Sequence, residues 1–125
     1  MARDLAVRLE VDRPGELGRL VQVLTRTGVN IEGIAEVDGL VHVLARDPRS
    51  ARNALRDAGY NIDSELEVLM VPMPDRPGEL AMIMRRLAEA EVNLKFVYLA
   101  TDTRVVIGTD DITQARAVLA QRPTS

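Results

Sequence analysis

The sequence contains no cysteine, and aromatic residues make up only 2% of its 125 residues. The absence of cysteine excludes disulfide bonds, thiolate metal sites and cysteine nucleophiles. The scarcity of aromatic residues argues against the RNA-binding domains whose sheets stack bases on aromatic side chains. The only histidine, His42, provides neither a group of imidazole metal ligands nor a general acid and base. We therefore expect no metal, no cofactor and no enzyme activity.

The sequence also has no excess of positive charge and no long apolar run. Its formal net charge is -3, with acidic and basic residues interspersed, so we expect no nucleic-acid partner. A membrane-spanning helix needs about 18 or more consecutive apolar residues, and the first four residues are not followed by the apolar region of a signal peptide. We expect a cytoplasmic protein without membrane contact, although 46% hydrophobic residues are enough to form a core.

The most informative feature is an internal repeat. The sequence Asp-Arg-Pro-Gly-Glu-Leu occurs at residues 12–17 and again at 75–80, an offset of 63 residues. The same offset aligns the apolar positions that follow, which are spaced as on the buried face of an amphipathic helix. It also aligns Val-Asn-Ile at 29–31 with Val-Asn-Leu at 92–94. From the next strand onward the offset becomes 64, as one added residue in a hairpin would produce.

Each copy predicts strands and helices in the same order. In the first copy we expect strands at 5–11, 30–37, 40–45 and 60–66 and helices at 15–26 and 48–58, with a hairpin turn at Asp38-Gly39. This βαββαβ order predicts an α+β fold of the ferredoxin-like type, in which two helices cover one face of an antiparallel sheet. We place the first domain at residues 1–66 and the second at 67–125.

The second copy is expected to lack its last strand. Its first strand is predicted at 68–73 and its second helix at 112–121, close to the end of the sequence at Ser125. The open edge of its sheet would then have to be covered by the first copy or by another chain. On this ground we predict a homodimer.

The two loops, each followed by an apolar helix and then by Val-Asn-Ile or Val-Asn-Leu, resemble the ACT domain. The resemblance covers nearly the whole chain, with the missing last strand as its one clear departure. It implies a non-catalytic regulatory module that binds an amino acid between two copies and acts on an amino-acid metabolic enzyme or a transporter. The ligand-binding residues that it implies are Asp12, Pro14, Gly15, Asn30 and Ile31 in the first copy and Asp75, Pro77, Gly78, Asn93 and Leu94 in the second.

The chemistry of these residue types fits an amino acid. Gly15 and Gly78 remove a side chain where a ligand would approach, and the N–H groups at a helix start can accept a carboxylate. Asp12 or Asp75 could pair with the ammonium group of the ligand. The asparagines at 30 and 93 each offer a donor and an acceptor, which suits a zwitterion.

Structural explanations for the same residues remain open at this point. Either aspartate could cap its helix or form a turn, and either asparagine could simply tolerate unusual backbone angles. Glu16 and Glu79 are expected to be solvated charges at the helix starts that would repel a ligand carboxylate. The leading hypothesis is an amino-acid-binding regulatory protein. The alternative is a protein-interaction module whose pockets are closed and whose sheet edge is the working surface.

Overall fold

The computed structural model of the protein describes residues 1–11 and 13–120. The chain divides into two compact units, Met1–Glu67 and Val68–Ser125. Unit 1 contains β1 (Arg3–Arg8), α1 (Glu16–Arg26), β2 (Ile31–Val37), β3 (Leu40–Ala45), α2 (Pro48–Asp57) and β4 (Ile62–Glu67). Unit 2 contains β5 (Leu69–Pro72), α3 (Glu79–Glu89), β6 (Leu94–Ala100), β7 (Arg104–Thr109) and α4 (Ile112–Ala120). The fold is therefore α+β, as predicted.

Unit 1 is an antiparallel sheet in the order β4-β1-β3-β2 with its helices on one face. The inward side chains of β1 and β3 alternate along each strand, and they pack against Leu20 and Leu24 of α1 and Leu55 of α2. The β2–β3 connection is the predicted two-residue hairpin, since Asp38 and Gly39 both have positive φ, 49° and 82°. This hairpin fixes the register of β2 against β3.

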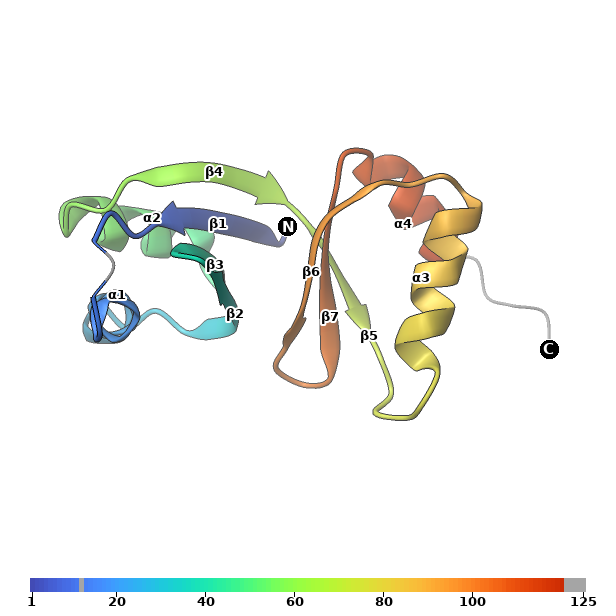
Figure 1. The fold of residues 1–125 in the computed structure, drawn as a ribbon, viewed down its shortest axis with the longest axis horizontal. Coiled ribbons are helices and arrows are strands. Elements are labelled where there is room, and N and C mark those ends of the chain that lie inside the picture. Colours follow the sequence, from blue (N-terminus) through green and yellow to red (C-terminus); the bar gives the residue numbers. More distant parts are fainter. Residues whose placement is uncertain (12, 121–125) are drawn as a thin grey trace. The chain divides into compact units, whose positions relative to one another are not determined.

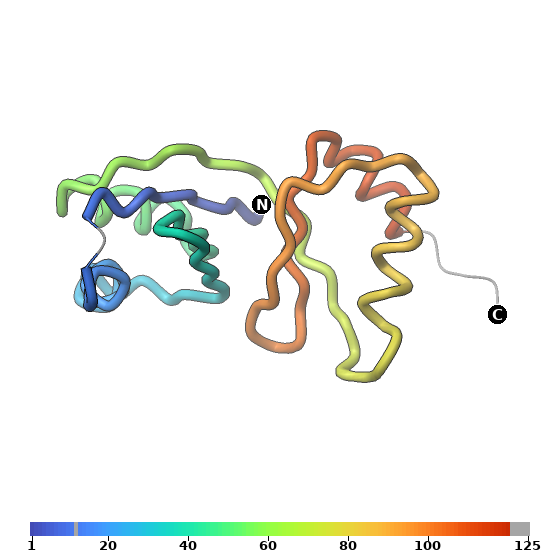
Figure 2. The backbone as a smooth tube through the Cα atoms, viewed as in Figure 1, coloured from blue at the N-terminus to red at the C-terminus, as the bar shows by residue number. Residues whose placement is uncertain are grey.

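Unit 2 repeats this arrangement in part. Its strands pair antiparallel in the order β6-β7-β5, and Figures 1 and 2 show α3 and α4 on the same side of them. Leu87 of α3 and Ala115 of α4 pack against Val105 and Ile107 of β7. Among the described residues of this unit, β5 pairs with β7 on one side and with no fourth strand on the other.

Several predicted boundaries were wrong by a few residues, always at the ends of elements. The first strand ends at Arg8 rather than at residue 11, because its partner β3 begins at Leu40, opposite Arg8. One further hydrogen bond, from the Leu9 N–H to the Gly39 carbonyl at 2.7 Å, is followed by a bend in the chain. The fourth strand begins at Ile62 rather than at residue 60, because the Tyr60 N–H still donates to the Leu55 carbonyl of α2 at 2.9 Å. The end of the predicted helix at 112–121 lies outside the described residues.

Candidate functional site

The loop between β1 and α1 is built around Gly15. Gly15 precedes the first residue of α1 and has a φ of 90°, and Gly78 precedes α3 with the same value. This left-handed conformation favours glycine strongly over other residues. A Cβ atom added to either glycine would meet no heavy atom within 4 Å. Glycine at these two positions therefore leaves open space beside the backbone and also suits the left-handed backbone angle.

An open hollow of about 520 Å³ lies beside Gly15 in unit 1. Its walls are the end of β1, the loop, the first turn of α1 and the β2–β3 hairpin. The lining residues are Leu9, Val11, Arg13, Gly15, Glu16, Leu17, Gly18, Glu36, Asp38 and Gly39. One guanidinium and three carboxylates thus lie around a space bounded by a helix start, so the hollow can offer partners to both positive and negative groups.

The charged residues of the hollow are held by the chain itself. Arg13 Nη2 lies 3.8 Å from Glu16 Oε1, and the Glu36 carboxylate accepts a hydrogen bond of 2.8 Å from the Gly39 N–H. The Arg13–Glu16 pair recurs in unit 2 as Arg76 Nη2 to Glu79 Oε1 at 2.7 Å. The repeated sequence therefore encodes an ion pair across the helix start in addition to a turn.

This ion pair corrects one expectation. Glu16 and Glu79 are not solvated charges, because only 14% and 21% of their side-chain surface is exposed. Their arginine partners lie in the same six-residue motif. The arginine partly compensates the carboxylate, so the repulsion expected for a ligand carboxylate is reduced.

One of the structural explanations left open, an aspartate that caps its helix, does not hold for Asp75. The residue that begins α3 is Gly78, with no side-chain hydrogen bond to the helix start, and Asp75 and Pro77 are exposed in the loop before it. In unit 1 the helix start at Gly15 likewise has no side-chain cap, and Pro14 is exposed. Asp12 lies outside the described residues.

The asparagines do not carry the unusual backbone angles that one interpretation assigned to them. The positive φ values of these turns belong to Gly28, at 76°, and to Glu91, at 58°, which is the repeat equivalent of Gly28. Asn30 instead receives the Arg46 N–H on its carbonyl at 3.0 Å. The Asn93 side-chain amide donates to Asp110 Oδ2 at 3.5 Å.

Unit 1 does not bring Gly15 and Asn30 together. Asn30 precedes Ile31, which pairs with Ala45 at one end of the β2–β3 ladder, whereas the hollow lies at the hairpin end. The seven residues of β2 separate the two ends by roughly 20 Å. Within unit 1, Gly15 and Asn30 are therefore too far apart to contact the same small ligand. In unit 2, Leu94 begins β6 with 39% of its surface exposed.

His42 is paired, although sequence reasoning assigned it no role. It lies on β3 opposite Ala6 and Ala35, outside the core beneath the helices. Its Nδ1 lies 2.8 Å from Oδ2 of Asp4, whose side chain is 1% exposed. This contact joins β1 to β3, and neither residue lines the hollow beside Gly15.

The described residues contain neither a metal-ligating cluster nor a helix that could span a membrane. Residues 1–11 and 13–120 hold no group of three or more metal-ligating side chains. Over the same residues, no helix is long and apolar enough to span a bilayer.

Comparison with known proteins gives matches to aspartate kinases and to their regulatory subunits. No protein-family model matches the sequence. A 50-residue segment, 40% of this chain, is 46% identical to an aspartokinase of Corynebacterium efficiens. The segment spans only 12% of that enzyme's length.

Solved structures match over nearly the whole chain. A crystal structure of a Bacteroides thetaiotaomicron protein has a TM-score of 0.76 and 26% identity, covering 94% of this chain and 85% of that one. The ligand-free regulatory subunit of Thermus thermophilus aspartate kinase has a TM-score of 0.68 and 16% identity, covering 95% and 91%. The Thermus thermophilus protein is a regulatory subunit, and at 16% identity the likeness to it is one of fold.

Proposed function

Because this chain has the fold of ACT-domain regulatory subunits, we propose that it is a non-catalytic regulatory protein that binds a free amino acid in the hollow beside Gly15. Each unit is one ferredoxin-like ACT copy, and the described part of the second contains three strands, β5, β6 and β7. The whole-chain match to regulatory subunits of aspartate kinases supports an amino-acid metabolic enzyme as the regulated partner.

The observation that carries this proposal is the composition of the hollow. A free amino acid brings a carboxylate and an ammonium group, and the hollow offers Arg13 and a helix start for the first and Glu36 and Asp38 for the second. The volume of about 520 Å³ is within the range of small-molecule sites. The absence of any atom within 4 Å of an added Gly15 Cβ leaves room for close approach to the backbone.

A facing copy would complete the site. The resemblance implies that Asn30 and Ile31, or Asn93 and Leu94, reach a ligand in the hollow from a second copy. Within residues 1–11 and 13–120, β5 has a partner strand on one side only, which supports a homodimer, since an exposed strand edge tends to be covered. Ligand binding would then change the packing between copies, and this change would be passed to the partner.

A thermal-shift panel of the common amino acids tests the proposal. One or two of them at millimolar concentration should raise the melting temperature, because a ligand that binds only the folded state stabilises it, by about 2.7 kcal/mol at 100 times Kd. Gly18→Leu should abolish the response, since it fills the hollow from the helix, where an added Cβ has open space.

The matched control is Ala81→Leu at the equivalent exposed position of α3. This variant should still show the rise in melting temperature that an amino acid causes by binding in the hollow of unit 1. No shift with any amino acid would contradict ligand binding and favour the alternative, a protein-interaction module that works through the β5 edge.

A further inference from the structure

A second feature of unit 1 is a groove rich in arginine at the start of α2. Two adjoining hollows, of about 510 and 390 Å³, share Arg52 and Glu65. Arg3 and Arg49 line the first, and Arg56 lines the second. We call this surface the arginine groove. It begins at the Arg3 end of β1, whereas the hollow beside Gly15 lies beyond the other end of that strand.

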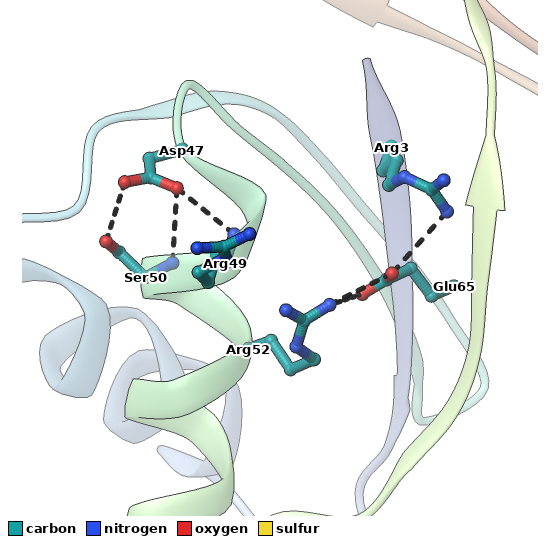
Figure 3. Close-up of polar contacts among 6 residues, drawn as sticks. All are labelled: Arg3, Asp47, Arg49, Ser50, Arg52 and Glu65. Atoms are coloured by element: carbon teal, nitrogen blue, oxygen red, sulfur yellow. Dashed lines mark hydrogen bonds and ion pairs between the residues drawn. The ribbon is translucent and has the colours of Figure 1, made fainter. Parts of the chain in front are cut away.

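The groove already holds a carboxylate of the chain. Arg52 Nη1 donates to both oxygens of Glu65, at 2.8 and 3.0 Å, and Arg3 Nη1 lies 3.5 Å from the same side chain. Figure 3 shows these contacts together with Arg49, on the first turn of α2. Guanidinium groups match carboxylates in geometry and charge, so the groove presents the chemistry that recognises acidic side chains.

Two arginines of the groove form no salt bridge within the described residues, although Arg49 lies near enough to Asp47 to lower the pKa of that carboxyl. Arg49 and Arg56 are exposed, and neither forms an ion pair with any residue in 1–11 or 13–120. With Arg52 they occupy positions i, i+3 and i+7 on α2 and lie on one helical face. Arg49 and Arg56 are therefore available to carboxylates from outside the chain.

The internal repeat shows that the fold does not require these arginines. The offset of 64 keeps the buried positions alike, since Ala51 corresponds to Ala115 and Leu55 to Leu119. Arg52, which pairs with Glu65, also has an arginine at its equivalent position, Arg116. The other basic positions differ: Arg46 corresponds to Asp110, Arg49 to Thr113 and Arg56 to Ala120. The second unit packs its helix without them, so the packing of this helix does not depend on their charge.

We propose that the arginine groove binds an acidic segment of a partner protein. The pairing of Arg52 with both Glu65 oxygens favours a short segment of acidic side chains, because the guanidinium groups of this groove already bind a carboxylate. A small inorganic anion is disfavoured at the helix start, where the Asp47 carboxylate already accepts from the N–H groups of Arg49 and Ser50. This surface does not depend on ligand binding beside Gly15.

The test uses the full chain and a fluorescent peptide. The ten residues of α2 span about 15 Å, which about five extended residues would cover, so a glutamate-rich peptide of about twelve residues is long enough. We expect saturable binding by fluorescence anisotropy that weakens as salt is added. The double variant Arg49→Thr, Arg56→Ala, which copies unit 2, should weaken binding at least about fivefold.

The control removes the same charge elsewhere. Arg26→Thr with Arg85→Ala changes two exposed arginines on α1 and α3 and should leave the peptide affinity within about twofold. The reversal Arg49→Glu, Arg56→Glu should instead bind a lysine-rich peptide, a gain that unfolding could not produce. Absence of peptide binding, equal losses in both double variants, or tighter binding of an oligonucleotide or anionic vesicles than of the peptide would overturn the proposal.

Discussion

Replacing Gly15 and Gly18 by alanine should change stability in opposite directions. Gly15 has a φ of 90°, and an L-residue in the left-handed region costs about 1–2 kcal/mol. The lower entropy of the unfolded chain offsets about 0.4–1 kcal/mol of this cost. Since an added Cβ meets no atom within 4 Å, no clash is added. We therefore expect Gly15→Ala to lower the free energy of unfolding by about 0.5–1.5 kcal/mol.

Gly18 lies within α1, has no positive φ, and an added Cβ there also meets no atom within 4 Å. Alanine is favoured over glycine inside a helix by about 0.5–1 kcal/mol, and the repeat equivalent of Gly18 is Ala81. Gly18→Ala should therefore raise the free energy of unfolding by about that amount.

Urea unfolding followed by far-ultraviolet circular dichroism measures both changes. The difference in unfolding free energy between the two variants should be about 1–2.5 kcal/mol, well above the error of midpoints compared at a common slope. Equal stability of Gly15→Ala and Gly18→Ala would refute the left-handed conformation assigned to the loop.

Three further variants test individual contacts. Hydrogen bonds from the first turn of α2, chiefly that of the Ser50 hydroxyl, lower the pKa of Asp47 from its ordinary 3.8. The Asp47 carboxylate therefore stabilises the fold fully above pH 3.8, and this contribution is lost as the pH falls through the pKa of the folded state. Asp47→Asn, which still caps the helix, should flatten the acid side of a plot of melting temperature against pH. Gly108→Ala would place a Cβ 2.4 Å from the Phe96 ring, so we expect a loss of about 1–3 kcal/mol in urea that Phe96→Ala largely relieves in the double variant. His42→Ala removes a partner of the buried Asp4 carboxylate and should cost about 1–3 kcal/mol by the same assay, a loss below about 0.5 contradicting the role of that contact.

The fold was predictable where the determining chemistry is local. The hairpin at Asp38-Gly39 and the strand at Leu40–Ala45 were predicted at the residues where they occur, because positive φ at two consecutive residues is encoded by the turn itself. The helix at Glu16–Arg26 followed from the spacing of its apolar residues. The ends of β1 and β4 were not predictable, since they depend on backbone hydrogen bonds to Gly39 and Leu55.

The site was predictable only in part. The repeat pointed to Gly15, which lines the hollow, but gave no sign of Glu36 and Asp38, which reach the hollow through the pairing of β1 with β3. The low exposure of the Glu16 side chain and its ion pair with Arg13 were also missed, although both residues lie in the repeated motif. The contribution of a facing copy stays a prediction, because it depends on contacts between copies.

Amide resonances in the hollow test the central claim most directly. In a ¹⁵N-labelled sample titrated with the amino acid that gives the largest thermal shift, the N–H signals of Gly15, Gly18 and Gly39 should move together and saturate at one Kd, because all three residues line the hollow. The same titration of Gly18→Leu should leave them in place. Saturable shifts confined to other residues, or none with any amino acid, would contradict the account.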